Sequence, residues 1–195
     1  MGRVYKSIDE CVGSTPLIEL GRVMRAHGLG ARLLAKVEGA NPWGSAKDRV
    51  ALAMIEDAER RGTLRRGSVI VEPTSGNTGV ALAAVAALKG YEAVIVMPDS
   101  ASKERVALIR AYGGRVEYCD GRYGMRGALA RARELVGAIE GAVMLGQFEN
   151  PANPRAHFCT TAVELWRDSK GELDALVAGV GTGGVITGIG RYLKS

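Results

Sequence analysis

The stretch SVIVEPTSGNTGVALAAVAAL, residues 68–88, joins two apolar patterns through a turn rich in glycine and hydroxyl groups. Ser68 to Glu72 is a β-branched apolar run with the length of a buried strand. Val80 to Leu88 is an unbroken run of alanine, valine and leucine, which is typical of a buried helix. A buried strand that passes directly into a helix indicates an α/β fold with a mainly parallel sheet.

The same alternation of strand and helix patterns continues on both sides of this stretch. Parallel strands need crossover helices, and a helix pattern follows most of the strand patterns. The strands are expected over residues 32–38, 68–72, 93–97, 115–118, 143–145 and 175–178. The helices are expected over residues 47–61, 77–88, 102–111 and 125–136, then through Trp166, and from about Val185.

Composition excludes several classes of function. Hydrophobic residues make up 47% of the chain and charged residues 24%, which is the balance of an ordinary globular protein. The net charge is +5, but only 5% of the residues are aromatic, so stacking on nucleic-acid bases is not indicated. The longest clean apolar run is too short to cross a bilayer. Three scattered cysteines without a CxxC pair indicate neither a zinc site nor a disulfide framework, and they favour the cytoplasm.

The first candidate for chemistry is Lys47, within the sequence NPWGSAKDR at residues 41–49. Proline and glycine end the preceding strand, so Lys47 falls in the first turn of a helix. The positive end of the helix dipole disfavours a charged amine and lowers its pKa, which suits a nucleophile or a base. A solvated surface lysine would show the same local pattern.

Two further turns stand before helices and are suited to binding anions, because free N–H groups at a helix start are anion donors. Residues 72–79, EPTSGNTG, add hydroxyls and an amide; a well-capped helix is the alternative, but a plain cap needs only one such residue. Residues 179–188, GVGTGGVITG, offer bare backbone without the spacing of a Rossmann or nucleotide phosphate loop.

Together these motifs resemble the cysteine synthase family of fold-type II pyridoxal-phosphate enzymes. NPxGSxKDR, TSGNTG and GTGGxxTG stand in the family's order, with GSTPL at residues 13–17 and QFxNPANP at residues 147–154 in support. The match covers nearly the whole chain. The fold that the resemblance implies is tryptophan synthase β-like: two three-layer αβα units on mainly parallel sheets, the second of them incomplete.

The resemblance implies a role for each motif around pyridoxal 5'-phosphate, and it implies no metal. Lys47 would form the Schiff base, and Asn77 would hydrogen-bond the oxygen of the ring hydroxyl. The cofactor phosphate would be held by Gly181, Thr182, Gly183, Gly184 and Val185. The α-carboxylate of the substrate would be bound by Thr74, Ser75, Thr78 and Gln147. Val185 departs from the family, which usually has threonine at this position.

The resemblance also implies a division of the chain. Residues 1–38 and residues 147–195 would belong to a larger domain, and residues 39–146 would form a smaller α/β domain. In the family a further part of the chain follows the position of Ser195 and supplies a serine that contacts the pyridine nitrogen. The strand at residues 175–178 would then lack its later neighbours and expose an apolar edge.

The implied activity is β-replacement on an activated serine, O-acetylserine or O-phosphoserine, with sulfide to form L-cysteine. The alternatives are cystathionine β-synthase, a serine or threonine dehydratase, or an inactive truncated binding partner. The expected partners are the amino-acid substrate, a sulfide donor, and either a second copy in a homodimer or a C-terminal fragment, with no nucleic acid and no membrane. The leaving group and the A or B type of the enzyme stay open.

Overall fold

The computed structural model describes residues 4–74 and 76–195, and the chain divides into two compact units. The central unit comprises residues 47–153. The split unit comprises the residues up to 46 together with residues 154–195. The boundaries expected after residues 38 and 146 both lie earlier in the chain than the boundaries between these units.

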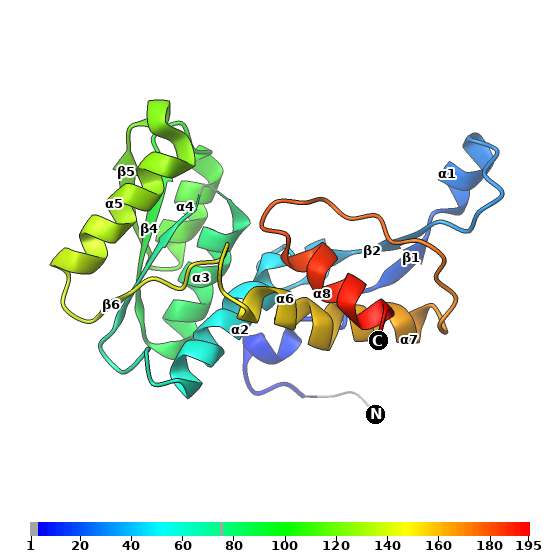
Figure 1. Cartoon of the computed structure of the whole chain (residues 1–195), viewed down its shortest axis with the longest axis horizontal. Coiled ribbons are helices and arrows are strands. Elements are labelled where there is room, and N and C mark those ends of the chain that lie inside the picture. The colour runs from blue at the N-terminus through cyan, green and yellow to red at the C-terminus, as the bar shows by residue number, and fades with distance from the viewer. Residues whose placement is uncertain (1–3, 75) are drawn as a thin grey trace. The chain divides into compact units, whose positions relative to one another are not determined.

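The central unit is built on a four-stranded parallel sheet in the order β5-β4-β3-β6 (Figure 1). Its strands are β3 (Val69–Pro73), β4 (Glu92–Pro98), β5 (Arg115–Cys119) and β6 (Ala142–Val143). Its helices are α2 (Lys47–Arg60), α3 (Asn77–Lys89), α4 (Lys103–Ala111) and α5 (Gly124–Ala138), with a 3-10 turn at Gly121–Tyr123. These strands and helices confirm the expected elements of this region, with ends displaced by a few residues at most.

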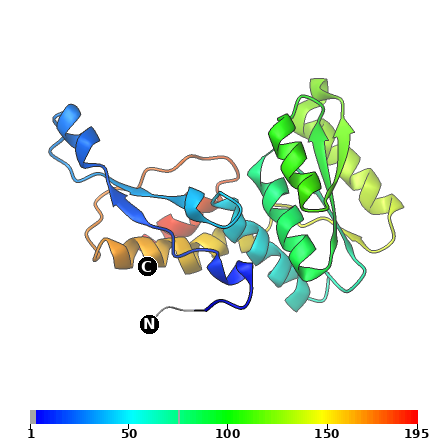
Figure 2. The ribbon, with the colours of Figure 1, turned by 180° about the vertical axis from the view of Figure 1, so that it is seen from behind.

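Helices cover both faces of this sheet, which gives the three layers of the predicted α/β class. Alternate residues of β3 and β4 point to opposite faces, so Val69, Val71, Val94 and Val96 pack with Ala128 and Ala132 of α5. The other face is covered by α3 and α4 (Figure 2). A Cβ on Gly79 of α3 would lie 2.8 Å from Cγ2 of Ile95, so glycine allows α3 to approach the sheet closely.

The split unit contains a two-stranded antiparallel sheet, in which β1 (Leu17–Glu19) pairs with β2 (Leu34–Lys36). The short helix α1 (Gly21–Ala26) lies between them in the chain, and 3-10 turns occupy Ile8–Cys11 and Glu38–Ala40. Only β2 was expected from the sequence, within residues 32–38. The three-residue strand β1 and the six-residue helix α1 are too short to show a clear hydrophobic period.

Two helical segments form the core of the split unit. The first runs through α6 (Ala152–Ala156), a π-helical turn (His157–Thr161) and α7 (Ala162–Asp168), and confirms the helix expected through Trp166. The second is α8 (Gly184–Leu193). Ala162, Leu165 and Ile189 are buried between them.

Between α7 and α8 the structure differs from the expectation, because residues 175–178 do not form a strand. Val177 is 95% exposed and Val180 is 72% exposed. A strand is stabilised by hydrogen bonds to a neighbouring strand, and in the described part of the chain no strand pairs with this segment. The strand predicted for residues 175–178 is therefore wrong for this structure, because the sequence pattern does not show whether a pairing partner is present.

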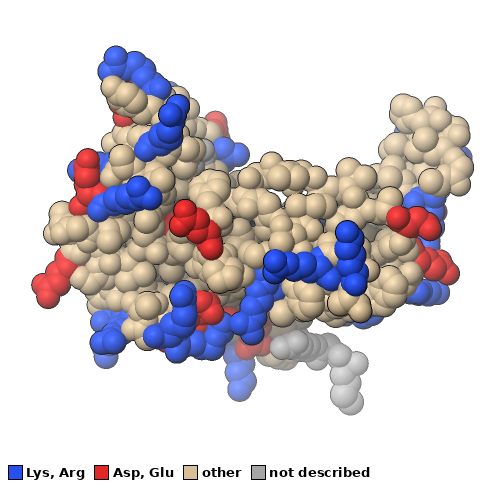
Figure 3. Space-filling model, viewed as in Figure 1, with Lys and Arg blue, Asp and Glu red and all other residues tan. Residues whose placement is uncertain are grey.

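None of the helices among the described residues is both long enough and apolar enough to span a membrane. On the face seen in Figure 3, lysine and arginine side chains are spread out with acidic side chains among them. This distribution agrees with a solvated surface rather than with a continuous basic stripe.

Candidate active site

Lys47 is the first residue of α2, and it lies in the central unit. The next three residues, Asp48 to Val50, are buried, and Lys47 itself is half-buried. This burial lowers the pKa of the Lys47 amine, because removal from water disfavours the charged form. A lysine amine with a lowered pKa is neutral more often at physiological pH, as a nucleophile or a base must be.

The turn between β3 and α3 brings polar groups to the end of the sheet. Thr74 is buried, and its Oγ1 accepts a hydrogen bond from the backbone N–H of Gly76 at 3.2 Å. Asn77 is exposed as the first residue of α3. The N-cap residue, Gly76, has no side chain with which to cap the helix. The predicted substrate residue Ser75 lies outside the described residues.

The predicted carboxylate-binding residues Thr78 and Gln147 lie side by side in the central unit. The Thr78 hydroxyl donates a hydrogen bond to Oε1 of Gln147 at 2.7 Å, and both side chains are almost fully buried. Nε2 of Gln147 lies 3.5 Å from the carbonyl oxygen of Pro73. Hydroxyl and amide groups can donate to a carboxylate, so this pair is a suitable element of an amino-acid site.

Glu72 holds the two segments of this arrangement together and was not among the predicted site residues. Its side chain is fully buried at the end of β3. Its two carboxylate oxygens accept hydrogen bonds from the backbone N–H groups of Gly146 and Gln147, each at 2.9 Å. Burial raises the pKa of Glu72, while these hydrogen bonds oppose the rise. The available signal in the sequence was a lone carboxylate at the end of an otherwise apolar strand.

The predicted phosphate-binding loop lies in the split unit and leads into α8. Gly183 is the N-cap residue of α8 and has a left-handed conformation, with φ of 79°. As a glycine, it has no side chain with which to cap the helix. The first N–H groups of a helix have no partner within the helix, so a helix that begins after a glycine is suited to binding a phosphate. Val185 packs against the buried core of Ala162, Leu165 and Ile189, which gives its side chain an apolar environment.

Comparison with known proteins identifies the family to which these features belong. The family model described as "Pyridoxal-phosphate dependent enzyme" matches residues 8–195. The chain belongs to this family. The fold is therefore that of a fold-type II pyridoxal-phosphate enzyme, and pyridoxal 5'-phosphate is the cofactor that defines the family.

Individual members of the family resemble the chain along its whole length. Cysteine synthase A of Escherichia coli (strain K12) is 47% identical over 195 residues, which are 100% of this chain and 59% of that protein. The crystal structure of a hydrogen sulfide-producing enzyme from Fusobacterium nucleatum has a TM-score of 0.94 at 41% identity, covering 98% of this chain and 63% of that one. The crystal structure of cysteine synthase from Entamoeba histolytica has a TM-score of 0.93 at 39% identity, and the match covers 98% of this chain and 57% of that one. The chain thus spans less than two thirds of the length of these relatives.

Each unit by itself offers a group that fits one part of the family's cofactor. The central unit offers an amine with a lowered pKa at Lys47. The split unit offers a glycine loop in which Gly183, the N-cap residue of α8, has no side chain. The amine of Lys47 fits the cofactor aldehyde, with which an amine can condense. The backbone N–H groups at the start of α8 fit the cofactor phosphate, to which they can donate.

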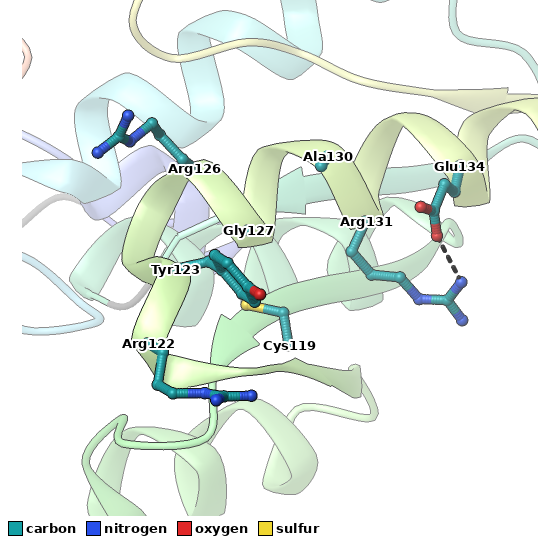
Figure 4. A pocket seen from close by; sticks show the side chains of 8 residues that line it. All are labelled: Cys119, Arg122, Tyr123, Arg126, Gly127, Ala130, Arg131 and Glu134. Carbon is teal, nitrogen blue, oxygen red and sulfur yellow. Dashed lines mark hydrogen bonds and ion pairs between the residues drawn. The ribbon is translucent and has the colours of Figure 1, made fainter.

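A separate groove of about 550 Å³ lies beside α5 in the central unit (Figure 4). A single helix is about 10 Å wide and cannot cover four strands spaced about 4.8 Å apart, so a hollow remains along its flank. The acidic partners of its arginines include Asp120 for Arg122 and Glu134 for Arg131. None of the predicted site residues lines this groove, which is formed by Cys119, Arg122, Tyr123, Arg126, Gly127, Ala130, Arg131 and Glu134.

Proposed function

We propose that this chain is the cofactor-binding part of a cysteine synthase, in which Lys47 carries pyridoxal 5'-phosphate. The observation that carries the proposal is the half-buried amine of Lys47, with its lowered pKa, at the start of α2. The 47% identity to a cysteine synthase supports the choice of reaction within the family. The proposed reaction is replacement of the β leaving group of O-acetylserine or O-phosphoserine by sulfide, which gives L-cysteine.

In this proposal Lys47 has two roles. Nζ of Lys47 would hold the cofactor by condensing with its aldehyde, with loss of water, and as a free amine it would accept the proton from the substrate Cα. The bound cofactor supplies an electron sink for the pair left by that proton. The lowered pKa of Lys47 increases the fraction of neutral Nζ that is available for both tasks.

The remaining predicted residues position the two ligands. Gly181, Thr182, Gly183, Gly184 and Val185 hold the phosphate, and Asn77 donates to the ring hydroxyl oxygen. Thr74, Ser75, Thr78 and Gln147 bind the substrate carboxylate. The hydroxyl of Thr78 now donates to Gln147, and it can donate to a carboxylate by rotation about its C–O bond. Such fixed donors hold the substrate so that its Cα proton faces Lys47.

The proposal includes partners and a location. Val177 and Val180 are highly exposed in a segment that pairs with no described strand. We propose that this segment is covered by polypeptide corresponding to the part of the relatives that this chain does not match. We further propose that the enzyme functions as a homodimer. Three cysteines without disulfides are consistent with a reducing cytoplasm.

Borohydride reduction followed by peptide mapping tests the proposal. The chain mixed with pyridoxal 5'-phosphate should turn yellow, and reduction should fix the label on Lys47. Lys47→Ala should remain colourless, with Lys89→Ala as a matched control that keeps the label. Label on Lys36, Lys89 or Lys103 instead of Lys47 would contradict the assignment. Pyruvate release without cysteine formation in the complete enzyme would favour a dehydratase.

A further inference from the structure

The π-helical turn His157–Thr161 interrupts the helix that packs beside α8 in the split unit. The backbone N–H of Ala162 donates to the carbonyl of His157, five residues earlier, as a π-turn requires. Side chains stabilise the turn as well. Nδ1 of buried His157 lies 2.9 Å from Oγ1 of Thr161, and the hydroxyl of Thr160 donates to the carbonyl of Ala156 at 2.6 Å.

The backbone of α8 approaches this turn at Gly188. A Cβ at that position would lie 2.3 Å from the carbonyl oxygen of Pro154, 2.8 Å from Cβ of His157 and 2.9 Å from the backbone nitrogen of Phe158. Two of these three atoms belong to the backbone, so rotation of a side chain cannot relieve the clash. One helical turn further along, the ring of Tyr192 meets that of Phe158 edge to face, with centroids 5.5 Å apart.

The same face of α8 leads back to the glycine loop. Gly184 is the first residue of the helix, is buried, and lies one turn before Gly188. Four residues of helix span about 6 Å and behave as a rigid segment. A shift of the backbone at Gly188 therefore displaces the N–H groups at the start of α8, because no flexible residue lies between them.

We propose that Gly188 is a positioning residue for the cofactor phosphate. Its contact with the π-turn fixes where α8 lies, and hence where the N–H groups of Gly183, Gly184 and Val185 are presented. The inference rests on the proposed function only in taking the phosphate of pyridoxal 5'-phosphate as the ligand of this loop.

Two matched substitutions in one helix test the contact. Gly188→Ala and Gly190→Ala make the same chemical change in α8, but a Cβ at Gly190 meets nothing within 4 Å. Apparent dissociation constants are measured by absorbance for pyridoxal 5'-phosphate and for pyridoxal, which has the aldehyde but no phosphate. Circular dichroism reports whether each variant is folded.

Gly188→Ala should weaken binding of pyridoxal 5'-phosphate about tenfold or more, since overpacking displaces backbone. Its binding of pyridoxal should change by no more than about twofold, and Gly190→Ala should resemble the wild type with both ligands. Equal behaviour of the two alanine variants, or equal weakening of both ligands in folded Gly188→Ala, would overturn the proposal.

A second variant decides the matter if Gly188→Ala does not fold. Thr161→Val keeps the shape of the side chain but removes the hydroxyl beside His157, and should lower the preference for the phosphorylated ligand by about threefold. An unchanged preference in folded Thr161→Val would then refute the role of the turn. A wild-type chain that takes no cofactor on Lys47 would instead refute the proposed function, and the two failures are therefore distinguishable.

Discussion

Residues 69–73 and residues 175–180 are both apolar segments with valine at their centres, yet only the first is a strand. β3 pairs with β4 on one side and with β6 on the other, and Val71 is fully buried. Residues 175–180 pair with no described strand, and Val177 is 95% exposed. An apolar β-forming sequence is therefore insufficient for a strand, because backbone groups need partners as much as side chains need burial.

The two units differ in the same way. In the central unit, crossover helices return the chain to the same sheet, so consecutive segments supply each other's neighbours. In the split unit, the antiparallel pair β1-β2 and the helical core leave the segment before α8 without such neighbours. We expect stability to be distributed accordingly. Two experiments compare the two units directly, and two more measure how much the buried Glu72 contributes within the central unit.

The largest difference should appear in amide hydrogen exchange. Backbone amides of β3 and β4 should exchange about a thousandfold or more slowly than those of residues 174–182, since the former open only when the sheet unfolds. Mass spectrometry of peptic peptides measures both regions in one sample. Comparable protection of the two regions would show that residues 174–182 are already paired, for example in a dimer, which light scattering would detect.

Glu72→Ala should cause the largest loss of stability by substitution. The change leaves the N–H groups of Gly146 and Gln147 without their acceptor, and each unsatisfied buried donor costs about 1–3 kcal/mol. The free energy of unfolding in urea should fall by about 3 kcal/mol or more. Asp57→Ala, a change at a more exposed carboxylate on α2, is the control and should cost about 1 kcal/mol at most.

Val71→Ala and Val177→Ala compare one substitution in the two regions. Val71 is fully buried, so its truncation should cost about 2 kcal/mol, whereas truncation of Val177 should change stability very little. Urea unfolding of both variants gives the comparison. In the presence of a complementing C-terminal polypeptide, Val177→Ala should lower the free energy of unfolding. If Val71→Ala and Val177→Ala lowered it equally without that polypeptide, Val177 would already be covered.

The smallest effect concerns pH. Burial raises the pKa of Glu72 above its ordinary value of 4.5 in the folded protein. The folded state therefore holds this proton more tightly than the unfolded state, and the contribution of Glu72 to stability falls as pH rises from 4.5 through the raised value. Glu72→Gln cannot titrate and should lack this component. Urea unfolding of the wild type and of Glu72→Gln at a series of pH values from 4.5 upward measures this component. If the free energy of unfolding had the same pH dependence in both proteins, a raised pKa of Glu72 would be excluded.

The sequence by itself determined the central unit and the candidate motifs. Strand and helix patterns over residues 47–143 are local, and crossover helices leave little choice of topology. The glycine-rich turns could also be placed at helix starts, because glycine and hydroxyl residues act there through their immediate neighbours. Lys47, Asn77 and Gly184 accordingly stand in the first turns of α2, α3 and α8.

Tertiary structure alone decided the features that depend on distant partners. Glu72 accepts hydrogen bonds from Gly146 and Gln147, which lie 74 and 75 positions further along the chain. No local sequence pattern encodes contacts over such a separation. The pairing of β1 with β2, the contact of Gly188 with the π-turn and the absence of a strand at residues 175–178 are of the same kind. In each case a segment's conformation depends on whether another segment satisfies its backbone or fills its space, and only the folded chain specifies that neighbour.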